Sequence, residues 1–213
     1  MATKDSSLPV WRRRRGERGS AIIEAAFVTP VFLLLLFGIL EYGLLFRNNL
    51  TTTNASQEAA RAASVGGRSL EADFITLETL EFGISAMGLD QLNYVVVFNA
   101  SATAPGVGSE LPDGHPCHTG SQAGVCNRYV AADFAAELDD GTGLPSGYFR
   151  CTTSALNLDG AWCPQSRRSG LGDDSDLVGV YVNTTHRYLT GFFGESQVLD
   201  ATTVIRVEPD ERP

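Results

Sequence analysis

The 213-residue sequence is almost devoid of lysine, because Lys4 is its only one and the remaining basic residues are arginine. The first 19 residues carry a net charge of +4, whereas the other 194 carry −13. Contacts to nucleic acid phosphates need clustered Lys and Arg. The acidic body of the chain therefore argues against nucleic acid as a partner, and its basic N-terminal end needs another explanation.

Recognisable catalytic motifs are also lacking. The sequence contains no G-x-S-x-G, no H-E-x-x-H and no glycine-rich phosphate-binding loop. The paired carboxylates Asp139 and Asp140 lie in a glycine-rich stretch that is typical of a solvated turn. We therefore expect no catalytic residues, no cofactor and no enzymatic activity.

Residues 25–40 carry no charge at all, and Glu24 and Glu41 flank this run. With its apolar extensions it covers residues 20–46, about 40 Å as a helix at about 1.5 Å per residue. The hydrocarbon core of a bilayer is about 30 Å thick and needs about 20 residues. The run predicts a transmembrane helix with both glutamates near the interfaces and Tyr42 at an interfacial depth.

Five arginines precede the run, and arginine and lysine are enriched on the cytoplasmic side of membrane helices. We therefore expect a cytoplasmic leader (residues 1–19), a transmembrane helix (20–46) and an extracytoplasmic domain (47–213) in a single-pass cell-membrane protein. A secretory signal peptide starts similarly, but no small-residue cleavage site follows Glu41. Pro30 lies inside the run, where transmembrane helices tolerate proline with a kink.

The basic leader ends in Gly19, and Ser20 and Glu24 are the first and fifth residues after it. This junction resembles the type III signal of type IV pilins, in which a prepilin peptidase cuts after the glycine. Residues 12–65 are most similar to TadE-like pseudopilins of the tight-adherence (Flp-type) pilus. The run RGSAIIEAAF and the acidic-aromatic pair Glu41-Tyr42 carry the resemblance, and ATTVIRVEP near the C-terminus is a weaker echo.

The resemblance implies a minor pseudopilin that acts in assembly of, or adhesion by, a tight-adherence pilus or a related secretion apparatus. It implies processing between Gly19 and Ser20 and possible incorporation into the pilus. The implied partners are the prepilin peptidase, the major pilin and other pseudopilins, an inner-membrane assembly platform and membrane lipid.

Glu24 is the residue for which this resemblance predicts a role in helix assembly. A charged side chain at the centre of a bilayer costs about 2.5–3.5 kcal/mol on insertion scales. Cleavage after Gly19 creates an α-amine at Ser20 that is charged below a pKa of about 8. Pairing with Glu24 of the same or a neighbouring chain would offset the desolvation of both groups. The alternative is that Glu24 simply lies among lipid headgroups.

The rest of the chain predicts an α+β fold, a long helix packed on a small antiparallel sheet. Alanines at helical spacing continue the first helix as far as Gly66-Gly67, and a 3.6-residue apolar period predicts a second helix from Ser69 to Gly88. Three β-rich runs predict strands: residues 92–98, 178–189 and 201–207. This arrangement agrees with the general plan of pilins.

A loop-rich stretch at about residues 99–175 holds all four cysteines and reads as an insertion. In an exported chain, four cysteines predict two disulfides with three possible pairings. The short loops favour the local pairing: Cys117 with Cys126 and Cys151 with Cys163. A short helix is expected over residues 133–138.

Two motifs in this stretch compete as metal sites. The HPCH run (115–118) has zinc-ligand chemistry without zinc-site spacing, and GDDSD (172–176) lacks the glycine and distal glutamate of a calcium loop. We expect neither to bind a metal, and we expect His186 to be an ordinary strand residue. Two other functions stay open: a membrane-anchored binding module unrelated to pili, and an exported enzyme with its site in residues 99–175.

Overall fold

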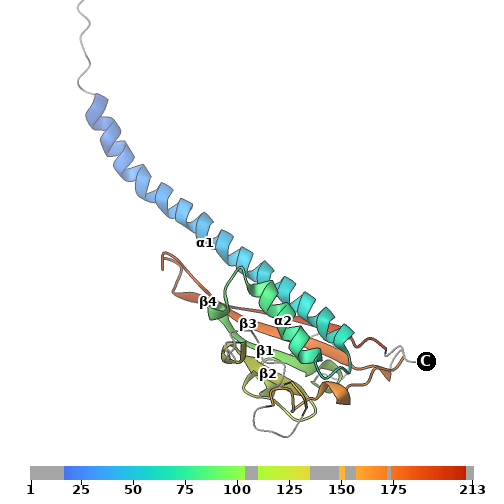
Figure 1. Ribbon diagram of the computed structural model, residues 1–213. Coiled ribbons are helices and arrows are strands. Elements are labelled where there is room, and N and C mark those ends of the chain that lie inside the picture. The colour runs from blue at the N-terminus through green and yellow to red at the C-terminus, as the bar shows by residue number, and fades with distance from the viewer. Residues whose placement is uncertain (1–16, 104–109, 135–148, 152–156, 172–173, 210–213) are drawn as a thin grey trace, which may run out of the picture. The chain divides into compact units, whose positions relative to one another are not determined.

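The computed structural model describes residues 17–103, 110–134, 149–151, 157–171 and 174–209 (Figure 1). The chain divides into two compact units, Met1–Tyr42 and Gly43–Pro213. Helix α1 (Glu17–Gly66) begins in the first unit and ends in the second. A long apolar N-terminal helix, a small antiparallel sheet and two disulfides confirm the expected α+β fold.

In the first unit, α1 is helical from Glu17 through Pro30 to Tyr42. Proline lacks the backbone N–H that a helix interior uses, and it breaks helices in water more readily than in membranes. The helix continues past Pro30 without interruption, as expected for a membrane segment.

The second unit is built on a four-stranded antiparallel sheet of order β2-β1-β3-β4. Helix α2 and the C-terminal part of α1 cover one face of this sheet (Figure 1). The strands are β1 (Leu92–Asn99), β2 (Cys126–Val130), β3 (Leu177–Arg187) and β4 (Ser196–Arg206). The helices after α1 are α2 (Ala72–Ile84), η1 (Leu89–Gln91), α3 (Ala100–Thr103), η2 (Pro116–His118), α4 (Ala131–Phe134) and η4 (Pro164–Ser166).

The main core lies between the two helices and the sheet. Small residues on α1 allow close approach, for example at Gly83 of α2, where an added Cβ would lie 3.0 Å from the Cβ of Ala55. Valines of β1 and β3 fill the space beneath, because alternate residues of a strand point to the same face. The buried apolar side chains here include Ala55, Ala59, Ala60, Ala63, Leu77, Leu80, Ile84, Val95, Val97, Val178, Val180 and Val182.

A second, smaller core covers the opposite face of the sheet. Val96, Phe98 and Tyr181 point to this side and pack against the segment that carries Cys117. The Phe98 ring lies over Gly179 on the neighbouring strand, where an added Cβ would come within 2.3 Å of Phe98 Cζ. Only glycine at position 179 leaves room for this ring.

Three expectations differ in detail from the structure. Helix α2 begins at Ala72 and not at Ser69, because residues 69–71 form the turn that follows α1. Strand β3 ends at Arg187, and β4 begins five residues before the expected position 201. The short helix expected over residues 133–138 overlaps α4, which covers Ala131–Phe134, and residues 135–138 lie outside the described part of the chain.

Strand β2 was not expected from the sequence. It pairs with β1 from Tyr94↔Val130 to Phe98↔Cys126, so the stretch 99–175 contributes an edge strand to the sheet. Five residues between glycine-rich segments are too short a pattern to distinguish a strand from a loop.

Candidate functional site

The residues of the expected processing site lie in the first turns of α1. Gly19, Ser20 and Glu24 are all exposed. Ser20 and Glu24 are four residues apart, so their side chains share a helix face with Cβ atoms about 5–6 Å apart. An α-amine at Ser20 would therefore lie one helical turn from the Glu24 carboxylate of its own chain. Carboxylates near a helix N-terminus are also stabilised by the helix dipole.

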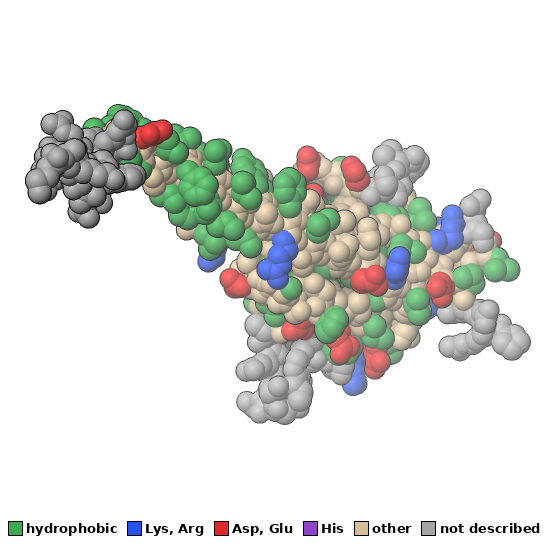
Figure 2. All heavy atoms as spheres, turned by 90° about the horizontal axis from the view of Figure 1, so that it is seen from above, with side chains coloured by type: hydrophobic (Ala, Val, Ile, Leu, Met, Phe, Trp, Pro, Cys, Tyr) green, Lys and Arg blue, Asp and Glu red, His purple; other side chains and the backbone are tan. Residues whose placement is uncertain are grey.

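Beyond Glu24, the surface of α1 is formed by large apolar side chains (Figure 2). Along residues 25–40 these side chains point outward around the helix, and no charged residue interrupts them. The most exposed are Phe27, Val28, Val31, Phe32, Leu34, Leu35, Ile39 and Leu40. By length and composition, α1 is a candidate membrane span, the only one within the described residues.

Glu41 and Tyr42 end the apolar run in different environments. The Glu41 side chain is 1% exposed, whereas Tyr42 is 48% exposed. Successive helical residues point about 100° apart, so neighbours can differ in this way. The predicted interfacial depth of both residues stays a prediction.

In the second unit, α1 contacts the sheet through a polar stripe of small side chains. Asn48, Thr52, Ser56 and Ser64 are buried at helical spacing, among the alanines expected from the sequence. Each makes hydrogen bonds to β3, β4 or the residues beside them. The pairs are Asn48 Nδ2 with His186 Nδ1 (2.9 Å), Thr52 Oγ1 with Thr184 Oγ1 (3.1 Å), Ser56 Oγ with Val180 O (3.0 Å) and Thr203 Oγ1 (3.1 Å), and Ser64 Oγ with Arg206 O (2.6 Å).

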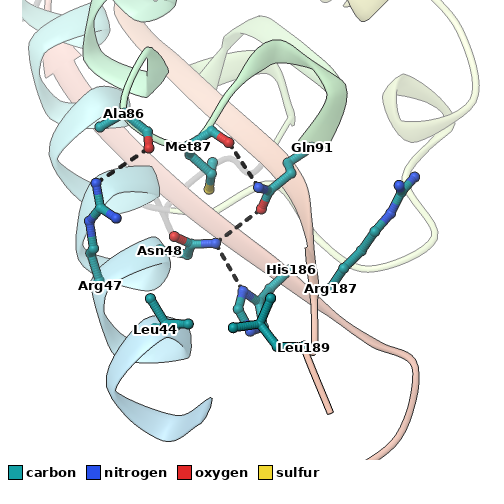
Figure 3. Close-up of a pocket in the computed structure, with 9 residues that line it drawn as sticks. All are labelled: Leu44, Arg47, Asn48, Ala86, Met87, Gln91, His186, Arg187 and Leu189. Atoms are coloured by element: carbon teal, nitrogen blue, oxygen red, sulfur yellow. Dashed lines mark hydrogen bonds between the residues drawn. The ribbon is translucent and has the colours of Figure 1, made fainter. Parts of the chain in front are cut away.

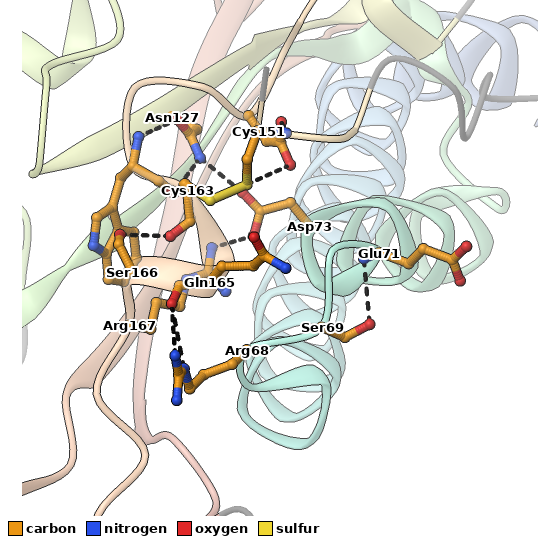
Figure 4. Close-up of a disulfide and its surroundings, with 12 residues drawn as sticks. Arg68, Ser69, Glu71, Asp73, Asn127, Cys151, Cys163, Gln165, Ser166 and Arg167 are labelled. Carbon is orange, nitrogen blue, oxygen red and sulfur yellow. Dashed lines mark hydrogen bonds and ion pairs between the residues drawn. A yellow bond between two sulfur atoms is a disulfide. The ribbon is translucent and has the colours of Figure 1, made fainter. Parts of the chain in front are cut away.

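A buried ion pair joins α2 to the segment after η4 (Figure 4). Arg167 and Asp73 are both fully buried, and Arg167 Nη2 donates to Asp73 Oδ1. The other oxygen of Asp73 accepts from Tyr129 Oη (2.6 Å) and Asn127 Nδ2 (2.9 Å). The guanidinium of Arg167 stacks on the Trp162 ring, 4.4 Å from its centroid. These contacts satisfy the buried Asp73 carboxylate, whereas Arg167 Nε and Nη1 are buried with no hydrogen-bond partner among the described residues.

Two groups in and beside this network have pKa values that burial shifts. Burial, followed by the charge of Asp73, raises the pKa of the Tyr129 phenol well above its usual value. Burial likewise raises the pKa of Asp159, which accepts from the Cys151 backbone N–H (3.0 Å). The sequence offered no signal for the network, since Asp73 reads as an ordinary acid in the first turn of a helix.

The structure joins Cys117 to Cys126 and Cys151 to Cys163, the local pairing that the short loops favoured. Cys117 is therefore not available as a thiolate ligand, which removes it from any zinc site at HPCH. In the calcium-like run, Asp176 is buried and accepts from Arg168, and position 173 lies outside the described residues. No cluster of three metal-ligating side chains occurs in the described parts of the chain.

A pocket of about 170 Å³ lies where the start of the domain segment of α1 meets the end of β3 (Figure 3). His186 lies in β3, as expected from the sequence, lines this pocket and is 3% exposed. The Asn48 amide donates to His186 Nδ1 and to Gln91 Oε1 (3.0 Å). In the neutral imidazole the proton is therefore on Nε2, which has no hydrogen-bond partner among the described residues.

An exposed apolar helix that leads into a compact disulfide-bonded α+β domain fits a single-pass membrane protein. Residues 19–61 match the family of TadE-like proteins, which confirms the resemblance for this segment and associates the chain with the tight-adherence pilus system. No curated protein and no solved structure matches the chain. The match begins at Gly19 and ends within the part of α1 that packs on the sheet, so it covers the apolar segment and most of the polar stripe.

Proposed function

We propose that the protein is a minor pseudopilin of a tight-adherence pilus or a related secretion apparatus. It is held in the membrane by residues 20–46, with the N-terminus in the cytoplasm and the domain outside. It acts by contact and not by chemistry, in assembly of the pilus or in adhesion. Its partners in this proposal are the prepilin peptidase, the major pilin, sister pseudopilins and an inner-membrane assembly platform.

The observation that carries the proposal is the start of the TadE-like match at Gly19, directly after the basic leader. From this point α1 presents one acid, Glu24, and then a charge-free apolar surface. No other part of its own unit packs on this surface, because none of the most apolar stretch of α1 is buried. Lipid or the helices of other pilin subunits would cover it.

Glu24 gives this surface a specific pairing group. A carboxylate among apolar side chains needs a partner, and an α-amine is the partner that cleavage supplies. The one-turn spacing allows pairing within the chain in the membrane, and the same two groups can exchange to a neighbouring helix in an assembled fibre. Cleavage and assembly are linked in this proposal because the first creates the charge that the second uses.

The test is the N-terminus of the membrane-extracted protein, measured by intact mass in cells with an active prepilin peptidase. We expect a chain that begins at Ser20, and Gly19→Val should retain the leader, because the peptidase cuts after a glycine. Gly16→Val changes another glycine of the same leader and should be processed normally. A wild-type chain that keeps residues 1–19 in these cells contradicts the proposal and favours a membrane-anchored binding module.

The role of Glu24 is tested by co-isolation with the major pilin. Glu24→Gln keeps the size of the side chain but cannot pair with an α-amine through charge, so we expect co-isolation to fall about tenfold, the equivalent of about 1.4 kcal/mol. Glu58→Gln, an exposed position further along α1, is the matched control and should have no effect. Unchanged co-isolation in Glu24→Gln would show that this acid lies among headgroups only.

A further inference from the structure

We propose that the β3–β4 hairpin and the adjoining pocket form a membrane-docking surface. This surface contacts the phosphate-bearing headgroups on the outer face of the cell membrane. The proposal goes beyond the pilus function and requires only that residues 20–46 span the bilayer. It concerns the second unit alone, at the end where its first residues, from Gly43 onward, lie.

The first step is the depth of that end of the unit. Arg47 follows Glu41 by six residues, about 9 Å along a helix. The headgroup regions together add about 10–15 Å to a hydrocarbon core of about 30 Å. The charge-free run has 16 residues, about 24 Å, so centred in the core it leaves about 3 Å of core at each end. Leu44 then lies about 3 Å beyond the core boundary, within the headgroup layer, and Arg47 lies about 7.5 Å beyond it, at the outer edge of that layer. Groups of the domain that contact these two residues then lie at the same depth.

The second step is that the hairpin is among these groups. Leu189, just after β3, lines the pocket together with Leu44 and Arg47, and His186 is hydrogen-bonded to Asn48 on α1. The hairpin therefore emerges beside the first residues of the unit (Figure 3). In this hairpin Leu189 is 77% exposed and Phe192 is 71% exposed.

The third step is the chemistry of the surface. Aromatic and leucine side chains are favoured at the boundary between headgroups and acyl chains, and long basic side chains extend from there to the phosphates. Arg47 and Arg187 flank the pocket on opposite sides, and no acidic side chain is among the residues that line it (Figure 3). Arg47 donates only to the Ala86 carbonyl (3.4 Å), and no described residue pairs with Arg187. The unpartnered Nε2 of His186 adds a buried donor to the same pocket.

Leu171 is an exposed apolar residue at the other end of the domain. It is 82% exposed and lies near Ser175, which bonds to Val207, on the side of the domain reached by Ser64 at the end of α1. Ser64 is 20 residues beyond Leu44, about 30 Å along a helix. Leu171 therefore provides a control at the end of the domain far from the proposed surface.

The experiment measures backbone hydrogen exchange of the full chain in nanodiscs, one copy per disc, with neutral phosphatidylcholine or with added anionic phosphatidylglycerol. We expect the amides of residues 189–194 to be protected in both lipids, and more strongly in the anionic one. Phe192→Ser/Phe193→Ser should abolish the protection, whereas Leu171→Ser should not change it. Each of Arg47→Gln and Arg187→Gln should lower the protection in anionic discs about fivefold. Arg61→Gln, exposed on the same helix, should not.

Three results would overturn the proposal. One is free exchange of the hairpin in both lipids, and another is protection that survives the double serine variant. The third is protection only when a disc holds several copies, which would assign the surface to a second chain. Each of these results leaves the cleavage at Gly19 untouched, so a failure here is distinguishable from a failure of the pseudopilin proposal.

Discussion

The two parts of helix α1 differ in which side chains they expose and which they bury. Along residues 25–40 it exposes large apolar side chains and has no charge, while along residues 48–64 it buries small and polar ones against a sheet. Both parts are regular α-helix. The same backbone therefore carries two kinds of surface by side-chain choice alone: bulky and apolar along the candidate membrane span, small and hydrogen-bonding where it packs on the sheet.

The domain differs from the apolar segment in its handling of charge as well. It buries an ion pair, Asp73 with Arg167, and satisfies the carboxylate with two further donors. The apolar segment has acids only at its ends, where Glu24 is exposed and Glu41 is 1% exposed. Burial of a charge is tolerated where hydrogen-bond partners can be built around it, and a lone helix in lipid cannot supply them.

The largest effect is expected from introducing charged side chains into the apolar segment of α1. Leu34→Arg/Leu35→Arg places two charges in the charge-free run, at about 2.5–3.5 kcal/mol each near a bilayer centre. We expect the variant to be lost from membranes on alkaline carbonate extraction. Asn49→Arg/Leu50→Arg, two exposed positions of the same helix in the domain, should be retained like the wild type. Equal retention of both variants would remove the basis for a membrane span.

An intermediate effect is expected from breaking the buried charge pair of the domain. Asp73→Ala leaves Arg167 without a counter-ion, and removal of one partner of a buried pair costs about 3–5 kcal/mol. The free energy of unfolding of the full chain in detergent, followed by denaturant titration, measures this loss. Glu78→Ala, exposed on the same helix, should change it by less than about 0.5 kcal/mol.

The double variant Asp73→Ala/Arg167→Ala sharpens this result. If the pair acts as a unit, the double variant loses less than the sum of the two single losses, because the second change removes a charge that is already uncompensated. Strict additivity would mean that Asp73 acts through its bonds to Tyr129 and Asn127 and not through its charge.

The apolar helix, its continuation into the domain and three of the four strands could be predicted from the sequence. A run without charge, a basic leader and a glycine-bounded junction define the apolar helix locally, and alanines at helical spacing extended it into the domain. Strands β1, β3 and β4 were likewise indicated by their β-branched runs. Each of these signals lies within one segment, so no knowledge of the fold was needed.

The rest depends on residues that are far apart in the chain. Asn48 meets His186 across 138 positions, and Asp73 meets Arg167 across 94. The serines and threonines of the stripe are poor indicators by themselves, since the same residues occur on solvated helix faces. β2 joins the sheet only because β1 offers it a neighbouring edge, and its own five residues carry no clear period.

The smallest effect is expected from comparing two adjacent threonines of α1, one buried against the sheet and one only partly buried. Thr52 is buried and its hydroxyl contacts both the Asn48 carbonyl and Thr184 Oγ1, whereas the Thr53 hydroxyl bonds only to the Asn49 carbonyl one turn back. Thr→Val keeps the shape and removes the hydroxyl at each site. Thr52→Val should lower the free energy of unfolding by about 1 kcal/mol, the typical net value of one hydrogen bond, and Thr53→Val by a smaller amount. The loss at position 52 is limited because Thr184 keeps its bond to the Leu199 carbonyl (3.3 Å). Equal effects at both positions would mean that the helix packs on the sheet through shape alone and that the polar stripe adds no stability.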